Sequence, residues 1–209
     1  MQITVEQIND QKTKERYRIP EDEVKRYLGA FRNTVITGEA EDLVKKCIGD
    51  VFDVSGFRSC YVKVPVEIDD SDVINLSILK TQSHDLAGNL AGCSEAVIFA
   101  ATIGSGVDRL IRRAELLSPA KLACYQAAGA ACVENYCNDL NKRLDEEMKE
   151  AGYKGHMRFS PGYGDLLLTN QRNIITELKC TTRIGITLTD QYMMMPSKSV
   201  TAIIGYEKI

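Results

Sequence analysis

The stretch from Ser118 to Gly152 reads SPAKLACYQAAGAACVENYCNDLNKRLDEEMKEAG and has the longest single periodicity in the chain. Ser118 suits an N-cap, and Pro119 suits the first helical position, where a missing N–H breaks no intrahelical hydrogen bond. Small and apolar residues recur at steps of three or four, at Ala123, Ala127, Ala130, Val133, Cys137, Leu140, Leu144 and Met148. The pattern predicts one helix over about 119–151, ending at Gly152.

Shorter elements flank this helix on both sides. Helical spacing of apolar residues predicts helices near 20–29, 39–54, 83–93 and 169–179, and one more after Gly104-Ser105-Gly106. Alternating or continuously apolar runs predict strands over 58–68, 73–79, 96–103, 183–188 and 197–206. Residues 1–19 are compatible with an edge strand or with a loose surface segment.

These elements together predict an α+β fold. Only a short acidic turn joins the strands at 58–68 and 73–79, so these two should be antiparallel, since a parallel return needs a long crossover. The run at 96–103 is apolar throughout, as expected of a strand covered on both faces. We expect a single domain with a mainly antiparallel, twisted sheet packed with helices.

Composition excludes several classes of protein. The chain has 209 residues, 44% of them hydrophobic, and no apolar run approaches the ~18 residues that cross a membrane. Met1 to Pro20 is polar and charged, so we expect no export and a cytoplasmic location. The net charge is −3 and basic residues are scattered among acids, so neither nucleic acid nor a membrane is an expected partner.

Cysteine and histidine usage argues against metal sites and nucleophilic catalysis. The seven cysteines are an odd number without a Cys-x-x-Cys pair, which is typical of reduced, buried thiols: Cys47, Cys60, Cys93, Cys124, Cys132, Cys137 and Cys180. The two histidines, His84 and His156, lie at no metal-ligand spacing from a cysteine or from each other. We expect no metal ligand and no catalytic residue.

The turn at Gly104-Ser105-Gly106 follows an apolar strand and precedes a helix, which resembles a nucleotide-binding loop. Arg109 stands where the dinucleotide fingerprint has its third glycine, and no Lys-Ser or Lys-Thr pair follows. The pattern therefore favours a strand-to-helix turn that needs a permissive backbone over a phosphate site.

A second turn, Arg158-Phe-Ser-Pro-Gly-Tyr163, follows the long helix. Pro161 restricts φ, Gly162 can adopt backbone angles closed to other residues, and Arg158 carries a fork of donors that matches a carboxylate. The spacing is compatible with a binding loop for an anionic ligand and also with an ordinary Pro-Gly turn beside a surface arginine.

The sequence that follows favours the binding loop. After Arg-x-x-x-Gly-Tyr come Leu188-Thr189-Asp190, then Met194-Met195-Pro196, then Ser199-Val200. Together these motifs resemble the reactivation domain of cobalamin-dependent methionine synthase. The resemblance is good over 116–205 and weak over 1–115, and we interpret residues 1–209 as one activation-type domain.

The resemblance implies a site for S-adenosylmethionine. It assigns the ligand carboxylate to Arg158 and the ligand amino group to Glu134, which by itself would be interpreted as a surface glutamate. It also assigns ligand contacts to Gly162 and Tyr163, with the backbone of Ser160 and Pro161 nearby.

The resemblance also implies the partners. The family docks on cobalamin so that inactive cob(II)alamin is reduced by a flavodoxin-like donor and remethylated to methylcobalamin. A chain of this length would be the reactivation subunit of a split methionine synthase. It would meet its cobalamin on a cobalamin-binding partner subunit and would not turn over alone.

The chain departs from the family at three places. Gly164-Asp165 replaces the usual proline and histidine region, Asp190 replaces a glutamate, and the chain ends at Ile209 before a segment that contributes a further tyrosine. An S-adenosylmethionine-independent capping or assembly protein for another corrinoid methyltransferase is therefore the alternative. An unrelated S-adenosylmethionine methyltransferase is not expected, because this chain lacks the glycine-rich strand-loop-helix of such an enzyme. Met193 to Met195 could fill a core or form a flexible apolar surface.

Overall fold

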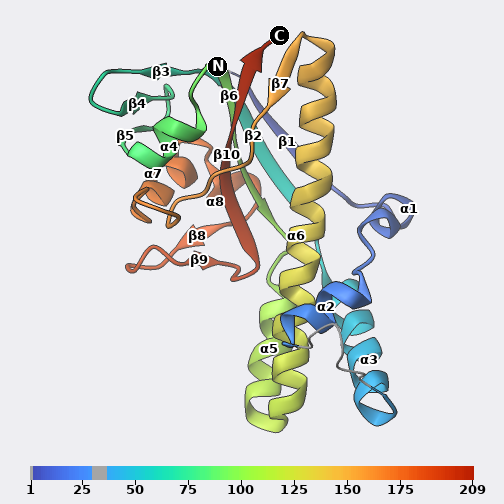
Figure 1. Cartoon of the computed structure of the whole chain (residues 1–209). Helices are drawn as coiled ribbons and strands as arrows, with labels where there is room; N and C mark the ends of the chain where they lie inside the picture. Colours follow the sequence, from blue (N-terminus) through green and yellow to red (C-terminus); the bar gives the residue numbers. More distant parts are fainter. Residues whose placement is uncertain (1, 30–36) are drawn as a thin grey trace.

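The computed structural model describes residues 2–29 and 37–209, and its longest element is helix α6 (Pro119–Glu150). As predicted, α6 begins with Pro119, and the Ser118 hydroxyl accepts a hydrogen bond from the Lys121 N–H at 3.3 Å. Ala123 is exposed and Ala130 half-buried, so the predicted apolar stripe is wrong at these two positions, whereas Ala127 and the predicted positions from Val133 to Met148 are buried. In Figure 1, α6 runs along the whole length of the sheet.

The main sheet has five strands in the order β1 (Ile3–Gln7), β2 (Arg58–Pro65), β6 (Cys93–Thr102), β10 (Ser199–Lys208) and β7 (Tyr153–Gly155). Every neighbouring pair is antiparallel. The apolar run of β6 lies in the middle and is buried on both faces from Ala96 to Thr102, as the sequence predicts. The α+β fold class is confirmed.

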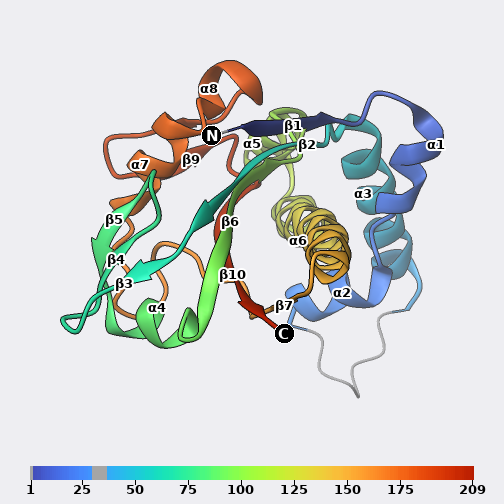
Figure 2. The same cartoon turned by 90° about the horizontal axis from the view of Figure 1, so that it is seen from above.

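One face of the sheet is covered by helices. There α6 packs with α2 (Glu21–Tyr27), α3 (Glu39–Val54) and α5 (Gly106–Leu117), and the short elements α1 (Gln11–Lys14) and η1 (Glu15–Tyr17) follow β1. Figure 2 shows this helical layer on one side of the strands. The predicted helices at 20–29 and 39–54 are confirmed.

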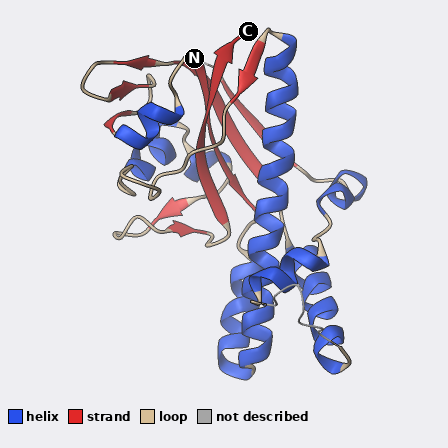
Figure 3. Cartoon of the chain, viewed as in Figure 1, coloured by secondary structure: helices blue, strands red, loops and turns tan. Residues whose placement is uncertain are grey.

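The other face carries a mixture of small elements (Figure 3). They are the sheet β3 (Glu67–Ile68), β4 (Val73–Asn75) and β5 (Lys80–Gln82), the helices α4 (His84–Asn89), α7 (Asn170–Glu177) and α8 (Cys180–Arg183), and the hairpin β8 (Thr187–Leu188) and β9 (Met194–Met195). Their apolar side chains form a second core against β2, β6 and β10.

Several predicted boundaries on this second face are wrong. The strand predicted at 73–79 ends at Asn75, because Ser77 takes a positive φ of 62° and turns the chain into β5, although the antiparallel pairing with β3 is correct. The strand predicted at 183–188 is confirmed only at Thr187 and Leu188, which form β8; Arg183 ends α8, and 184–186 form a turn and loop between them. The helix predicted at 83–93 stops at Asn89, and Cys93 already belongs to β6.

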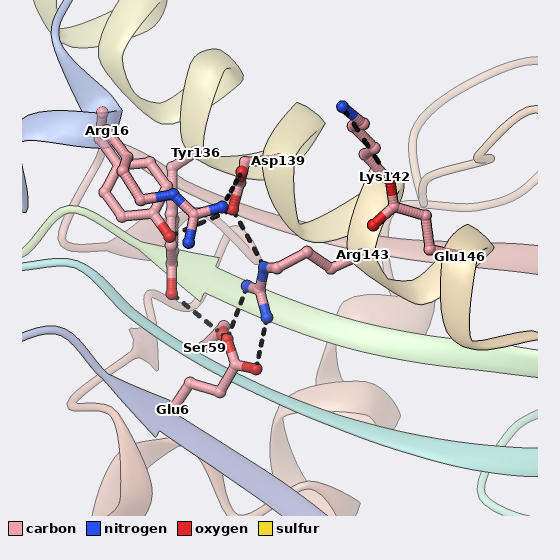
Figure 4. A network of polar contacts seen from close by, with 9 residues as sticks. Glu6, Arg16, Ser59, Tyr136, Asp139, Lys142, Arg143 and Glu146 are labelled. Carbon is pink, nitrogen blue, oxygen red and sulfur yellow. Dashed lines mark hydrogen bonds and ion pairs between the residues drawn. The ribbon is translucent and has the colours of Figure 1, made fainter. Parts of the chain in front are cut away.

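A polar network fixes the N-terminal strand to the long helix (Figure 4). Arg143 of α6 donates to both carboxylate oxygens of Glu6 in β1, at 2.7 and 2.8 Å, and to Asp139 at 3.0 Å. Tyr136 donates to the Ser59 hydroxyl of β2 at 3.0 Å. Residues 1–19, which the sequence left open, thus include a paired edge strand.

Packing accounts for the glycines at the Gly104–Gly106 turn. Gly104 has a positive φ of 81°. A Cβ on Gly106 would lie 2.3 Å from the Val54 carbonyl oxygen, so α5 can approach α3 only through a glycine here.

Among the described helices, none is both long and apolar enough to cross a membrane.

Candidate functional site

A cavity of about 930 Å³ lies between α6, the segment that follows β7, and β10. In Figure 1 this segment, drawn in orange, crosses β10 on its way to α7. On this side β10 is paired by β7 at Tyr206 to Lys208 and by Phe159 at Ile203. In the described part of the chain no strand pairs with residues 199–202 on that side, and three of them, Ser199, Val200 and Thr201, border the cavity.

Glu134 and Arg158 meet in the wall of this cavity. Glu134 projects from α6, and Arg158 lies one residue before the bridge between Phe159 and Ile203. Arg158 Nη2 donates to Glu134 Oε2 at 2.6 Å. Their side chains are 23% and 39% exposed, so this charged pair is partly desolvated and stronger than a surface pair.

The second terminal nitrogen of Arg158 is left without a bond. Arg158 Nη1 is buried and finds no hydrogen-bond partner among the described residues. A buried donor without an acceptor costs about 1–3 kcal/mol, and more when it is charged, so such groups usually have a partner that the protein alone does not supply. Arg158 Nη1 is therefore available to donate a hydrogen bond to an acceptor on a ligand in the cavity.

The loop after Arg158 is a tight turn. The Tyr163 N–H donates to Ser160 O at 3.2 Å, and the Gly162 N–H donates to Leu166 O at 2.8 Å. Gly162 takes a φ of 95°, which only glycine adopts readily. Among the predicted site residues, Glu134, Arg158, Ser160, Pro161 and Tyr163 line the cavity, whereas Gly162 shapes the turn without lining it.

The departure at Gly164-Asp165 has a structural reason. The Asp165 carboxylate accepts hydrogen bonds from the Ser83 hydroxyl and from the N–H groups of His84 and Asp85 at the start of α4. The bond from Ser83, followed by those from the backbone, lowers the Asp165 pKa. Gly164 takes a positive φ of 52°, which favours glycine, and a Cβ there would also crowd the Asp85 carboxylate.

Sequence reasoning missed the uncharged polar end of the cavity. Gln171 at the start of α7 and Thr201 of β10 line it and are almost fully buried. The Gln171 amide donates to Tyr192 O at 2.8 Å and accepts from the Thr201 hydroxyl at 3.2 Å. A lone glutamine in the first turn of a helix carries no recognisable motif, so no pattern in the sequence indicated this pair.

Large apolar side chains are exposed around the cavity. Met157, Tyr163, Leu167, Met193 and Met195 each have more than half of their surface exposed. We call these five residues the apolar rim. For Met193 and Met195 the core interpretation is therefore wrong, whereas Met194 packs against the second core.

Cys93, His156 and Glu207 approach each other without forming a catalytic triad. Cys93 Sγ lies 3.5 Å from His156 Nδ1, but that nitrogen is 2.7 Å from the Asn89 carbonyl oxygen and must donate its hydrogen there. Burial, and then Glu207, raises the pKa of the Cys93 thiol to about 11. In the described residues, His, Cys, Asp and Glu side chains form no group of three that could hold a metal ion.

The architecture is that of a methionine synthase reactivation domain. The crystal structure of the MetH reactivation domain bound to AdoHcy superposes with a TM-score of 0.69 at 18% identity, covering 98% of this chain and 78% of that one. Residues 133–208 match the family described as the activation domain of vitamin B12-dependent methionine synthase, which confirms the recognition made from the motifs. No curated protein sequence matches the chain.

Proposed function

We propose that this chain is the reactivation subunit of a split cobalamin-dependent methionine synthase. It binds S-adenosylmethionine in the cavity between α6 and β10 and docks on a partner subunit that carries cobalamin. The family match over residues 133–208 and the AdoHcy-bound neighbour of the same fold support this function.

The observation that carries the proposal is the buried, unpaired Nη1 of Arg158 beside its bond to Glu134. A ligand carboxylate would accept from this nitrogen, and a guanidinium can serve Glu134 and a carboxylate at the same time because it has five donors. The other carboxylate oxygen of Glu134, Oε1, would then accept from the ligand ammonium. An α-amino acid carries both groups on one carbon, so it fits this pair.

The residues of this chain would contribute by positioning. Methyl transfer from a sulfonium needs no acid or base, and holding two reactants in the right geometry can supply about 7–11 kcal/mol of a barrier. When bound, the cobalamin of the partner supplies the methyl acceptor, after taking one electron from a flavodoxin-like donor. The apolar rim, with the Tyr163 ring, would cover the flat face of that cofactor.

Calorimetric titration with S-adenosylhomocysteine tests the ligand site without allowing methyl transfer. We expect Arg158→Ala to weaken binding by about 100-fold, because two charge-assisted hydrogen bonds are lost. Arg109→Ala is the matched control, since Arg109 lies on α5 and bonds to Ser105 instead of the cavity. Equal affinity of the wild type and Arg158→Ala would contradict the proposed site.

A spectroscopic experiment tests the subunit function. The protein is mixed with a cob(II)alamin-loaded partner, a reductant and S-adenosylmethionine, and the methylcobalamin spectrum is expected to appear only with all components. Capture of the corrinoid partner by protein that ignores S-adenosylmethionine would select the capping or assembly alternative instead.

A further inference from the structure

The uncharged end of the cavity holds an amide whose orientation is fixed. Gln171 is only 4% exposed. Its Nε2 faces the Tyr192 carbonyl oxygen, which can only accept, and its Oε1 faces the Thr201 hydroxyl, which donates to it. Turning the amide over would place two acceptors against each other at Tyr192, so the orientation shown is the one the network allows.

This amide still has capacity for a ligand. The amide nitrogen carries two hydrogens and the amide oxygen two lone pairs, and the described residues use one of each. Each of the two atoms can therefore make one further hydrogen bond, so this part of the cavity wall suits a ligand that brings one donor and one acceptor side by side.

The two ends of the cavity differ in charge. Glu134 and Arg158 form the charged end on the side of α6. The end near Gln171 is lined by uncharged residues from α7, the turn before it, β9 and β10: Leu168, Gln171, Met194, Ser199 and Thr201. An S-adenosyl ligand has the same division, with a zwitterionic amino-acid end and an uncharged heteroaromatic end.

We propose that Gln171, held in place by Thr201, reads the adenine ring of the ligand. The inference rests on the proposed function and names a base-reading residue for the same site. Glutamine can bond to adenine through two atoms, with Oε1 accepting from the 6-amino group and Nε2 donating to N7. A 6-oxo purine places a second acceptor against Oε1, so the fixed amide selects the 6-amino ring.

The test compares S-adenosylhomocysteine with S-inosylhomocysteine, which differ only at position 6 of the purine. Calorimetry with the wild type is expected to show a preference for the adenosyl ligand of about 5-fold to 150-fold, the range for one bidentate base contact. Gln171→Met, which keeps the length of the side chain, should weaken adenosyl binding by about the same factor and leave inosyl binding nearly unchanged.

Thr201→Val and Asn170→Leu complete the design. Thr201→Val keeps the Gln171 amide but removes the hydroxyl that holds the amide oxygen in position, so the preference for the adenosyl ligand should shrink. This variant keeps the proposal testable if Gln171→Met fails to fold. Asn170 is the matched control, because it is the neighbouring buried amide, donates to Leu167 O at 3.0 Å, and lies outside the cavity wall. Asn170→Leu should keep the wild-type preference.

The outcomes separate the two proposals. Wild-type binding that depends on Arg158 but shows equal affinity for both ligands would overturn the role of Gln171 and leave the proposed function standing. An unchanged preference in folded Gln171→Met or in Thr201→Val would do the same. Absence of binding of either ligand to the wild type would overturn both.

Discussion

In the proposed site, the pair formed by Glu134 and Arg158 would select the ligand. Arg158 Nη2 and Glu134 Oε2 lie 2.6 Å apart, so the two charges neutralise each other. The pair therefore offers guanidinium donors next to a carboxylate acceptor and carries no net charge. A purely anionic ligand would meet Glu134 as a repulsive neighbour, whereas a zwitterion satisfies both groups. The pair therefore favours amino acids over simple carboxylates.

Glu134→Gln tests this argument. The substitution keeps the shape of the side chain but removes the charge that would face the ligand ammonium, and we expect S-adenosylhomocysteine to bind about 10-fold more weakly. Titration calorimetry gives the affinity. Glu146→Gln is the matched control, because Glu146 lies on the exposed side of α6, 3.9 Å from Lys142.

The result also distinguishes two roles of the carboxylate. Weaker binding of S-adenosylhomocysteine with unchanged binding of its deaminated analogue would assign Glu134 to the ammonium. An equal loss for both ligands would show that Glu134 serves only to orient Arg158.

The contact between α3 and α5 depends on a single missing side chain. A Cβ on Gly106 would meet both the backbone and the side chain of Val54. We expect Gly106→Ala to lower the free energy of unfolding by about 1–3 kcal/mol, as overpacked core substitutions do. Urea unfolding followed by circular dichroism measures the change.

Gly49→Ala is the opposite test on a neighbouring element. Gly49 lies inside α3, and a Cβ there would meet nothing within 4 Å. We expect this substitution to stabilise the protein by about 0.5–1 kcal/mol, because alanine loses less conformational entropy in a helix. A loss of stability in Gly49→Ala similar to that in Gly106→Ala would contradict the packing explanation.

Elements with strong local signals were predictable from the sequence. The periodicity of α3, the N-cap and periodicity of α6, and the apolar run of β6 describe those elements within a few residues. The strand predicted at 183–188 is shortened to Thr187–Leu188, because Lys179 takes a left-handed φ of 51° and starts the short helix α8, which ends at Arg183. The β-branched residues of the predicted run do not reveal this helix. The strand β7 is only three residues long and depends on pairing with the distant β10.

The candidate site was predictable only where a motif carried it. The Arg-x-x-x-Gly-Tyr turn indicated four residues that line the cavity: Arg158, Ser160, Pro161 and Tyr163. Gln171 and Thr201 are brought together by the packing of α7 on β10, and no spacing along the chain records that contact. The pairing of Glu134 with Arg158 is likewise a tertiary contact that the sequence did not predict. It is compatible with the ligand amino group and the ligand carboxylate that the resemblance assigned to these two residues.

Burial of many thiols makes the whole molecule sensitive to alkaline pH. Burial raises the pKa of Cys47, Cys132 and Cys137 to about 12 each. In the unfolded chain these thiols ionise near 8.5–9, so the unfolded state loses protons that the folded state keeps. Their contribution to stability is complete below pH 8.5 and is lost as the pH rises towards 12.

At pH 10 each of these thiols should lower the free energy of unfolding by about 1.4 kcal/mol relative to neutral pH. The three together would remove about 4 kcal/mol, a large part of the stability of an ordinary domain. Urea midpoints at pH 7.5 and 10 under reducing conditions measure the effect. Cys137→Ala should be less stable at both values but should show a smaller difference between them, and equal midpoints of the wild type would contradict the argument.

At the scale of the assembly, the apolar rim and the cavity should be separable. Leu167 and Met195 belong to the rim but do not line the cavity. We expect Leu167→Asp and Met195→Asp to leave the affinity for S-adenosylhomocysteine within about 2-fold and to weaken binding of the cobalamin-carrying partner by about 10-fold, because a carboxylate would be desolvated in the interface.

Leu116 provides the matched control for this surface. Among the described large apolar residues it is the most exposed; it lies one residue before the end of α5 and does not line the cavity. Leu116→Asp should change neither affinity, and sedimentation of the mixed subunits would measure partner binding for all three variants. If Leu116→Asp lost partner binding and the rim variants kept it, the partner would dock at the end of α5 and not at the apolar rim. The proposed site for the methyl donor would then face away from the cobalamin of the partner, which would contradict the argument.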